Sequence, residues 1–140
     1  DQILIDKSTE VEQKVREAFD YQRGDLNFHL ALSAIWELMA TCDKYITSSA
    51  PWTLKKNNEE DRLKQVLYNL VDVIRLIGMW LIPFMPQTAE KIYQQLNLKL
   101  PKTFEEGMCS DSIPNGHSLG ESFPLFPRIE VCRGDSVDRP

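Results

Sequence analysis

Apolar residues recur along residues 9–100 at the three- and four-residue spacing of amphipathic helices. Near the start of this region, Thr9 is followed three residues later by Glu12, which has the form of a capping box and predicts a helix start. We predict that this helix runs to about Tyr21 and that Gly24 closes it. Its predicted apolar face consists of Val11, Val15, Ala18 and Phe19.

A second, longer helix is predicted over residues 25–49, which would make it about 37 Å long. Its predicted apolar face consists of Phe28, Leu32, Ile35, Leu38 or Met39, Cys42, Tyr45 and Ile46. Pro51 ends this helix, because proline disfavours the helical conformation at Ala50 and has no N–H to donate. Proline also suits the first position of a helix, so a short new turn can start there. The chain is therefore predicted to turn a corner at Trp52.

Two further helices follow this corner. Residues 59–82 carry an apolar stripe that broadens towards the C-terminus, as in a helix at the centre of a bundle. The stripe consists of Leu63, Val66, Leu67, Leu70, Val71, Ile74, Ile77 and Leu81. Pro83 ends that helix, and Pro86 lies at the start of a fourth one. No alternating, strand-like pattern competes, so we predict an all-α fold, an antiparallel helix bundle over residues 1–100.

The composition changes after residue 100. Residues 101–130 are rich in Pro, Gly and Ser and show no helical period, yet they retain several large apolar side chains. These are Leu119, Phe123, Leu125, Phe126 and Ile129. We therefore predict an extended tail that packs back on the bundle, and we expect residues 131–140 to be flexible.

Composition excludes several classes of protein. The chain has 140 residues, of which 42% are hydrophobic, enough for one domain with a single core. The longest uncharged apolar run, residues 76–89, is too short to span a bilayer and contains two prolines. The first ten residues lack the pattern of a signal peptide. We predict neither a membrane protein nor a secreted one.

The cysteines and histidines do not form a predicted metal site. Cys42, Cys109 and Cys132 are odd in number and widely separated, without a C-x-x-C pair, which favours a reducing compartment. His29 and His117 have no carboxylate or cysteine at ligand spacing. We therefore expect no metal in this segment.

Charge is unevenly distributed along the chain. The formal net charge is −5, yet residues 44–64, which surround Trp52, carry five basic and three acidic side chains. The overall acidity argues against bulk electrostatic binding of nucleic acid. A local basic region around an aromatic ring remains compatible with binding a nucleic acid loop.

No catalytic constellation is found, since the chain has no glycine-rich phosphate loop and no nucleophile elbow. Trp52 is the candidate functional residue, with two possible roles. It could close the end of the bundle, burying its ring against Tyr45 or Leu54. Alternatively, it could expose its ring as a platform for an unstacked base of single-stranded RNA. In the second case phosphates would meet the neighbouring basic side chains, Lys44, Lys55, Lys56, Arg62 and Lys64.

Three segments resemble a known family. They are "NFHLALSAIWELMATCDKYITSSAPWTLKK" (27–56), "DRLKQVLYNLVDVIRLIGMWLIPFMPQTAEKIYQQL" (61–96) and "GHSLGESFPLFPRIE" (116–130). Their order, with K-Y-I, A-P-W, P-F-M-P and L-F-P-R-I-E, resembles the C-terminal anticodon-binding domain of the methionyl-tRNA synthetases, which are class I aminoacyl-tRNA synthetases. The resemblance implies recognition of the CAU anticodon loop of tRNA(Met).

The resemblance also implies roles for individual residues. Trp52 would stack on the first anticodon base, and Pro51 would shape the corner. Asp43 stands where the family often has asparagine, and a carboxylate can accept a hydrogen bond from the amino group of cytosine. The predicted anticodon-binding residues are Trp52, Pro51, Asp43, Lys44, Lys55 and Lys56. The family's L-x-N-R-like motif has no match before Asp6, so part of the family's binding surface is expected to be missing.

A parent enzyme is implied that joins methionine to tRNA with ATP. Its chemistry would belong to an upstream Rossmann-type domain, with ATP, and zinc as a second candidate, bound there. This segment would be non-catalytic and without a cofactor. We expect a cytoplasmic location if the source is bacterial and the mitochondrial matrix if it is organellar. Two alternatives stay open: the helical anticodon domain of another class I synthetase for an aliphatic amino acid, and a helical protein-interaction module anchored by Trp52.

Overall fold

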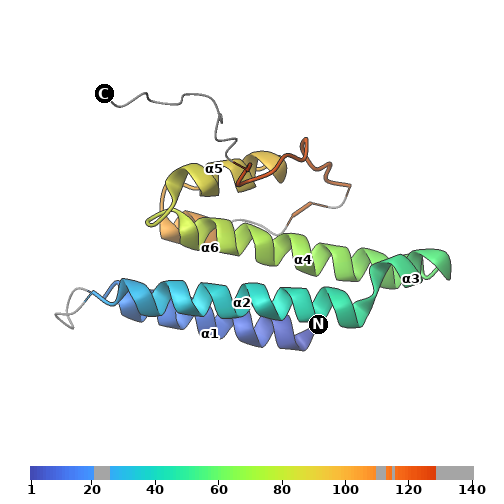
Figure 1. The fold of residues 1–140 in the computed structure, drawn as a ribbon, viewed down its shortest axis with the longest axis horizontal. Coiled ribbons are helices and arrows are strands. Elements are labelled where there is room, and N and C mark those ends of the chain that lie inside the picture. The colour runs from blue at the N-terminus through green and yellow to red at the C-terminus, as the bar shows by residue number, and fades with distance from the viewer. Residues whose placement is uncertain (21–25, 110–112, 115, 129–140) are drawn as a thin grey trace, which may run out of the picture.

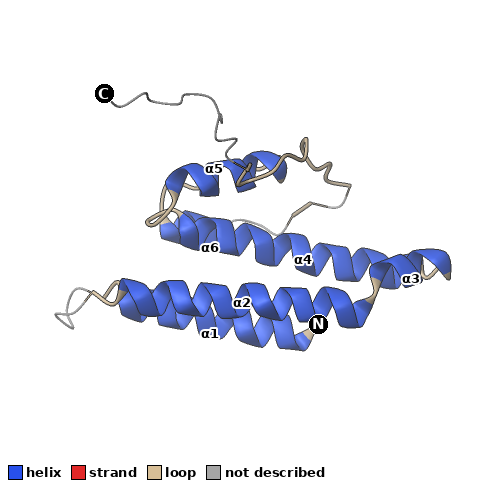
Figure 2. Ribbon diagram, viewed as in Figure 1, coloured by secondary structure: helices blue, strands red, loops and turns tan. Residues whose placement is uncertain are grey.

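The computed structural model describes residues 1–20, 26–109, 113–114 and 116–128. Across these ranges the regular elements are helices, and no strand occurs (Figure 2). The helices are α1 (Gln2–Ala18), α2 (Phe28–Ser49), α3 (Pro51–Lys56), α4 (Glu60–Leu81), α5 (Pro86–Gln95) and α6 (Phe104–Cys109). The predicted all-α fold is confirmed.

The long helices pack in an antiparallel arrangement with α4 at its centre (Figure 1). Helices α1 and α2 lie side by side, and α4 packs against both. Helix α5 covers the opposite side of α4. Helix α3 extends the end of the molecule where α2 finishes and α4 begins, and α1 starts at this same end (Figure 1). The central position predicted for residues 59–82 is therefore confirmed.

The first helix begins earlier than its capping-box pattern predicts. Helix α1 starts at Gln2, so the predicted start at Thr9 is wrong. The Thr9 hydroxyl instead donates to the carbonyl of Ile5 at 2.9 Å, as threonine can do inside a helix. Leu4, which is buried, extends the predicted apolar face by two turns towards the N-terminus. The helix ends at Ala18, and the predicted closing residues Tyr21 and Gly24 lie outside the described residues.

Helices α2 and α4 bury about half of the positions predicted for their apolar faces, and Phe28 of the predicted α2 face is 46% exposed. In α2 the buried side is Leu38 rather than Met39, which is 41% exposed. In α4, Leu67 and Ile74 belong to the predicted stripe but are exposed, because the helices packed against α4 cover only part of its surface. The largest fully buried side chains of the core are Trp80, Leu4, Ile35, Leu38, Met79, Val11, Val15 and Val66.

A cluster of three phenylalanines closes the end of the bundle opposite α3. The ring centroids of Phe19 and Phe28 lie 5.5 Å apart, and Phe84 lies 5.7 and 6.1 Å from them. Such tilted and edge-to-face pairs are favourable beyond the apolar area that they bury. They join the C-terminal end of α1 and the N-terminal end of α2 to the turn after α4.

Helix α6 was not predicted, because its short sequence shows no helical period. Residues 104–109 are helical, so the prediction of extended structure throughout 101–130 is wrong here. Arg75 holds this helix on α4. Arg75 is 6% exposed, and its side chain donates to the carbonyl of Gly107 at 2.8 Å and to Asp72 Oδ1 at 2.9 Å. These hydrogen bonds compensate for much of the hydration that the guanidinium loses on burial.

The segment after α6 contacts the C-terminal end of α5 mainly through hydrogen bonds. These are Asn97 Nδ2 to Ser118 O at 3.1 Å, Gln95 Nε2 to Phe123 O at 2.8 Å, Gly120 N to Gln95 O at 2.8 Å, and His117 Nε2 with Leu96 O at 2.7 Å. Leu125 packs on the core. Leu119 and Phe126 are 57% and 71% exposed, so the prediction that their side chains pack on the bundle is wrong. Residues 129–140 lie outside the described part.

Candidate functional site

The corner predicted at Pro51 is present and depends on an unusual backbone conformation. Ala50 has φ 42° and ψ 62°, in the left-handed region that residues with a side chain rarely adopt. Its N–H still donates to the carbonyl of Ile46 at 3.0 Å, and its own carbonyl accepts from Thr53 at 2.8 Å. Helix α3 begins at Pro51, as predicted. Ala50 therefore keeps backbone hydrogen bonds to both helices where the chain leaves α2 and starts α3.

Trp52 presents its ring to solvent at the start of α3. Its side chain is 61% exposed, and no residue of α3 is buried. The alternative in which Trp52 is buried against Tyr45 or Leu54 at the bundle end is therefore wrong. Burying such a ring would remove a large apolar area from water, so its exposure leaves a surface able to receive a ligand.

Two of the predicted basic residues share α3 with Trp52, and a third lies on α2. Lys55 and Lys56 occupy the last turn of α3, where the negative end of the helix dipole favours cations. Lys44 is exposed on α2. Within the described residues, none of these three lysines forms an ion pair. Their charges are thus available to an anionic ligand in this part of the structure.

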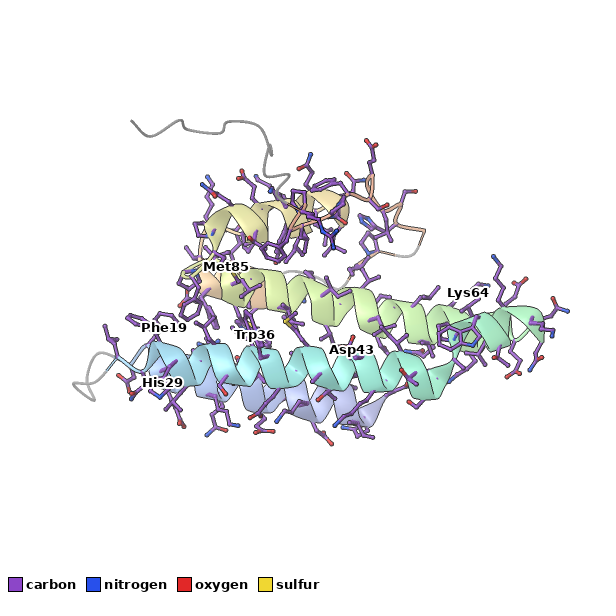
Figure 3. The ribbon with its side chains drawn as sticks, in the orientation of Figure 1. Phe19, His29, Trp36, Asp43, Lys64 and Met85 are labelled. Atoms are coloured by element: carbon purple, nitrogen blue, oxygen red, sulfur yellow. The ribbon has the colours of Figure 1, made fainter. Side chains whose placement is uncertain are left out.

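Asp43 lies on α2 and is exposed. Asp43 belongs to the last third of α2. In Figure 3 Lys64 lies near α3, whereas His29 lies near the opposite end of α2. Of the six predicted site residues, Asp43 and Lys44 lie on the last two turns of α2, and the other four lie on α3. Lys64, one of the additional basic residues, has Glu60 Oε2 at 3.6 Å.

The structure adds a polar network that the sequence did not reveal. Tyr45 is 8% exposed, and its hydroxyl donates to a carboxylate oxygen of Asp1. The same hydroxyl accepts from Asn69 Nδ2 at 3.4 Å. Arg62 pairs with both oxygens of Asp1. We call Asp1, Tyr45, Arg62 and Asn69 the Tyr45 network. Its members are far apart in the sequence, so no local pattern indicates it.

The described residues give little support for a metal site, a reactive thiol or a membrane-spanning helix. They contain no group of three His, Cys, Asp or Glu side chains that could hold a metal ion. Cys42 is a buried free thiol, and burial, followed by the charge of Asp43, raises its pKa to about 11. A thiol with this pKa is a poor nucleophile near neutral pH. None of the described helices is both long and apolar enough to cross a membrane.

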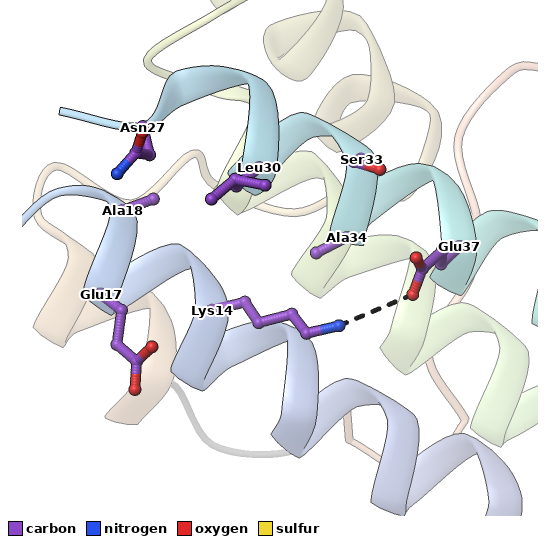
Figure 4. Close-up of a pocket in the computed structure, with 8 residues that line it drawn as sticks. All are labelled: Lys14, Glu17, Ala18, Asn27, Leu30, Ser33, Ala34 and Glu37. Carbon is purple, nitrogen blue, oxygen red and sulfur yellow. Dashed lines mark ion pairs between the residues drawn. The ribbon is translucent and has the colours of Figure 1, made fainter.

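A cavity of about 370 Å³ lies between α1 and α2 (Figure 4). Lys14 Nζ, which lines it, lies 3.7 Å from Glu37 Oε2 and 2.6 Å from Glu10 Oε1. The hydrogen bond with Glu10 raises the pKa of Lys14, and the one with Lys7 lowers the pKa of Glu37. The pairs of Lys7 and Lys14 with Glu37 link the two helices but contribute little to stability, because they lie at the surface. We assign no ligand to this cavity.

Comparisons of this chain with family models and with individual proteins indicate the same family. Residues 1–124 match the family described as "Anticodon-binding domain of tRNA ligase". The chain is 37% identical over 132 residues to a methionine–tRNA ligase of Caldanaerobacter subterraneus and 39% identical over 132 residues to one of Clostridium acetobutylicum. Each match covers 94% of this chain but 20% of the relative. The chain thus spans about a fifth of the length of these relatives.

Solved structures give the same family. The fold is similar to part of the apo methionyl-tRNA synthetase of Mycobacterium tuberculosis, with a TM-score of 0.78 and 28% sequence identity. That match covers 93% of this chain and 26% of the other chain. A second structure of the same enzyme, in complex with methionyl-adenylate, matches with a TM-score of 0.77.

Proposed function

Because the chain belongs to the family of anticodon-binding domains of tRNA ligases, we propose that it recognises the CAU anticodon loop of tRNA(Met) and directs that tRNA to a methionine–tRNA ligase of which it is a part. The exposure of Trp52, which is 61% accessible to solvent, is the observation that carries this proposal. Single-stranded RNA loops are read mainly through bases that unstack from their neighbours and stack on protein aromatic rings. Such stacking is worth about 1–3 kcal/mol per base.

The surroundings of the ring support the same proposal. Lys55 and Lys56 follow Trp52 on α3, and Lys44 lies on α2, so phosphates flanking a stacked base would meet positive charge. A few cations suit a short loop better than a long duplex. Pro51 shapes the corner that presents the ring. The exposed carboxylate of Asp43 is proposed to accept a hydrogen bond from the amino group of cytosine, the first base of CAU.

The catalytic chemistry is proposed to lie outside this segment. The relatives in the comparison are named as methionine–tRNA ligases, and this chain corresponds to about a fifth of their length. In the proposed whole enzyme, methionine is activated with ATP and transferred to tRNA by the remaining part, which is also where any zinc would bind. The compartment would be the bacterial cytoplasm, consistent with the bacterial relatives, or the mitochondrial matrix if the source is organellar.

Substitution of Trp52 tests the proposal. In the complete ligase, Trp52→Ala is expected to raise the Kd for tRNA(Met) by about 5- to 150-fold, the equivalent of about 1–3 kcal/mol of stacking. Aminoacylation should weaken in parallel, whereas methionine-dependent ATP–pyrophosphate exchange should stay near the wild-type rate. Trp36→Ala, which removes another half-exposed tryptophan of α2, is the matched control. Equal loss of aminoacylation and exchange in Trp52→Ala would contradict the proposal.

The two alternatives make different predictions. A synthetase for another aliphatic amino acid would bind and charge its own tRNA in preference to tRNA(Met). A protein-interaction module would bind an anticodon stem-loop without dependence on the anticodon sequence. The family match favours a tRNA-binding role over the protein-interaction module. Filter binding with CAU and altered stem-loops separates the three possibilities.

A further inference from the structure

We propose that the Tyr45 hydroxyl is a positioning group for the anticodon platform, joining three helices so that Trp52 is held in a stacking position. This inference rests on the proposed function. It concerns the Tyr45 network and not a direct contact with RNA, because Tyr45 is 8% exposed. The hydroxyl donates to Asp1 at the start of α1 and accepts from Asn69 of α4. One oxygen atom of α2 therefore bridges the two other long helices at the end of the bundle near α3.

Each polar group of the network has a defined partner. Gln65 Nε2 donates to Asn69 Oδ1 at 3.0 Å, which orients the Asn69 amide so that its nitrogen faces Tyr45. At the other end, the Arg62 guanidinium holds both carboxylate oxygens of Asp1, with Nη2 at 3.0 Å from Oδ1. Bidentate pairing of this kind fixes geometry as well as charge. Consecutive hydrogen bonds of a chain also strengthen one another.

Helix α3 depends on its neighbours for its position. It has six residues and none is buried, so its own packing against the core is limited to partly buried side chains such as Leu54. Backbone hydrogen bonds attach it at both ends. The Ala50 N–H donates to Ile46 of α2, and the Glu59 N–H, just before α4, donates to Leu54 at 3.0 Å. The position of α3 therefore follows from the positions of the end of α2 and the start of α4.

The Tyr45 network fixes those two ends relative to each other. Tyr45 lies in the last turns of α2, Arg62 in the first turn of α4, and Asn69 two turns further along α4. Loss of the hydroxyl leaves the Asn69 amide and the Asp1 carboxylate without their shared partner. The two helix ends then gain freedom, and the ring of Trp52 stacks on a base in a smaller fraction of complexes.

Tyr45→Phe is the test, since it removes only the hydroxyl and retains the buried ring. The complete ligase would be titrated with a CAU stem-loop that carries pyrrolocytosine, a fluorescent cytosine analogue quenched by stacking, at the first anticodon position. We expect the Kd to rise about fivefold, with brighter emission at saturation than in the wild-type complex. The slope of log Kd against log salt should stay unchanged, because no phosphate contact is removed.

Two variants accompany this test. Tyr68 is a more exposed tyrosine and lies on α4. Tyr68→Phe removes its hydroxyl and should leave affinity and emission at the wild-type level. Asn69→Ala breaks the network from a half-buried position on α4, and should reproduce the Tyr45→Phe effect even if Tyr45→Phe folds poorly. Circular dichroism of each variant shows whether the fold is retained.

The outcomes are distinct. If Trp52→Ala weakens binding while Tyr45→Phe and Asn69→Ala bind with wild-type affinity and emission, the positioning role is refuted and the proposed function stands. A smaller salt slope in Tyr45→Phe would also refute positioning, since it would indicate a lost phosphate contact. If Trp52→Ala itself leaves binding unchanged, the proposed function fails and this inference fails with it.

Discussion

Replacement of Arg75 by methionine should release α6 from the bundle and lower the stability of the fold. Methionine keeps a long unbranched stem in the core but removes the guanidinium. Arg75 is 6% exposed, and its guanidinium donates to Gly107 O at 2.8 Å and to Asp72 Oδ1 at 2.9 Å. The two lost interactions differ in their surroundings, and this difference sets the size of the effect.

The magnitude follows from what each partner can do without Arg75. Gly107 is buried, so its carbonyl would lack a donor, which costs about 1–3 kcal/mol. Asp72, with a side chain 33% exposed, can return to water, and losing that pair costs less than about 1 kcal/mol. Relief of the buried charge acts in the opposite direction. We expect a net loss of about 2 kcal/mol, which lowers the Tm by about 7 °C for a domain of this size.

Urea denaturation and hydrogen exchange would measure this effect. Arg75→Met should reduce the free energy of unfolding and speed the exchange of the amides of α6, whereas those of α1 and α2 should change less. Arg128→Met is the control, because Arg128 is exposed and a surface change of this kind is usually worth less than about 0.5 kcal/mol. A loss below about 0.5 kcal/mol in Arg75→Met, or unchanged exchange in α6, would refute the reasoning.

Two further predictions concern a thiol and a close backbone approach. Cys42, with a pKa of about 11, should react slowly with iodoacetamide near neutral pH, and the reaction rate should rise until the pH passes about 11. A plateau near pH 9 would show that burial does not raise the pKa of the thiol. Gly120→Ala should loosen the segment after α6, because a Cβ there would lie 2.5 Å from the carbonyl oxygen of Gln94. Thermal unfolding should show a loss of about 1–2 kcal/mol, absent in Ser118→Ala, which keeps its backbone hydrogen bond.

Proline explains why much of the fold could be predicted. Pro51, Pro83 and Pro86 end or start helices through a restricted φ and a missing N–H, which are properties of the residue itself. The observed helices α3 and α5 begin at Pro51 and Pro86. The exposure of Trp52 could not be predicted in this way, because the sequence near Pro51 allowed both a buried and an exposed ring.

Other features depend on contacts between distant residues and could not be predicted. Helix α1 starts before Thr9 because packing continues to Leu4, and a local capping pattern does not report such packing. Helix α6 is held by Arg75, which lies 32 residues before Gly107. In the Tyr45 network, Asp1 and Tyr45 are 44 residues apart. Residues that follow one another in a pattern are predictable, whereas hydrogen bonds across such separations require the folded chain.

The left-handed conformation of Ala50 restricts which amino acids can occupy a position that carries no binding group. With φ at 42°, glycine or asparagine would fit this position at little cost and alanine is tolerated, whereas valine or isoleucine would clash with the backbone. Asn58, at the other end of α3, also has a positive φ of 59° and is a residue that tolerates it. Sequence variation among functional homologues should therefore be narrow at position 50, although its side chain is only a methyl group.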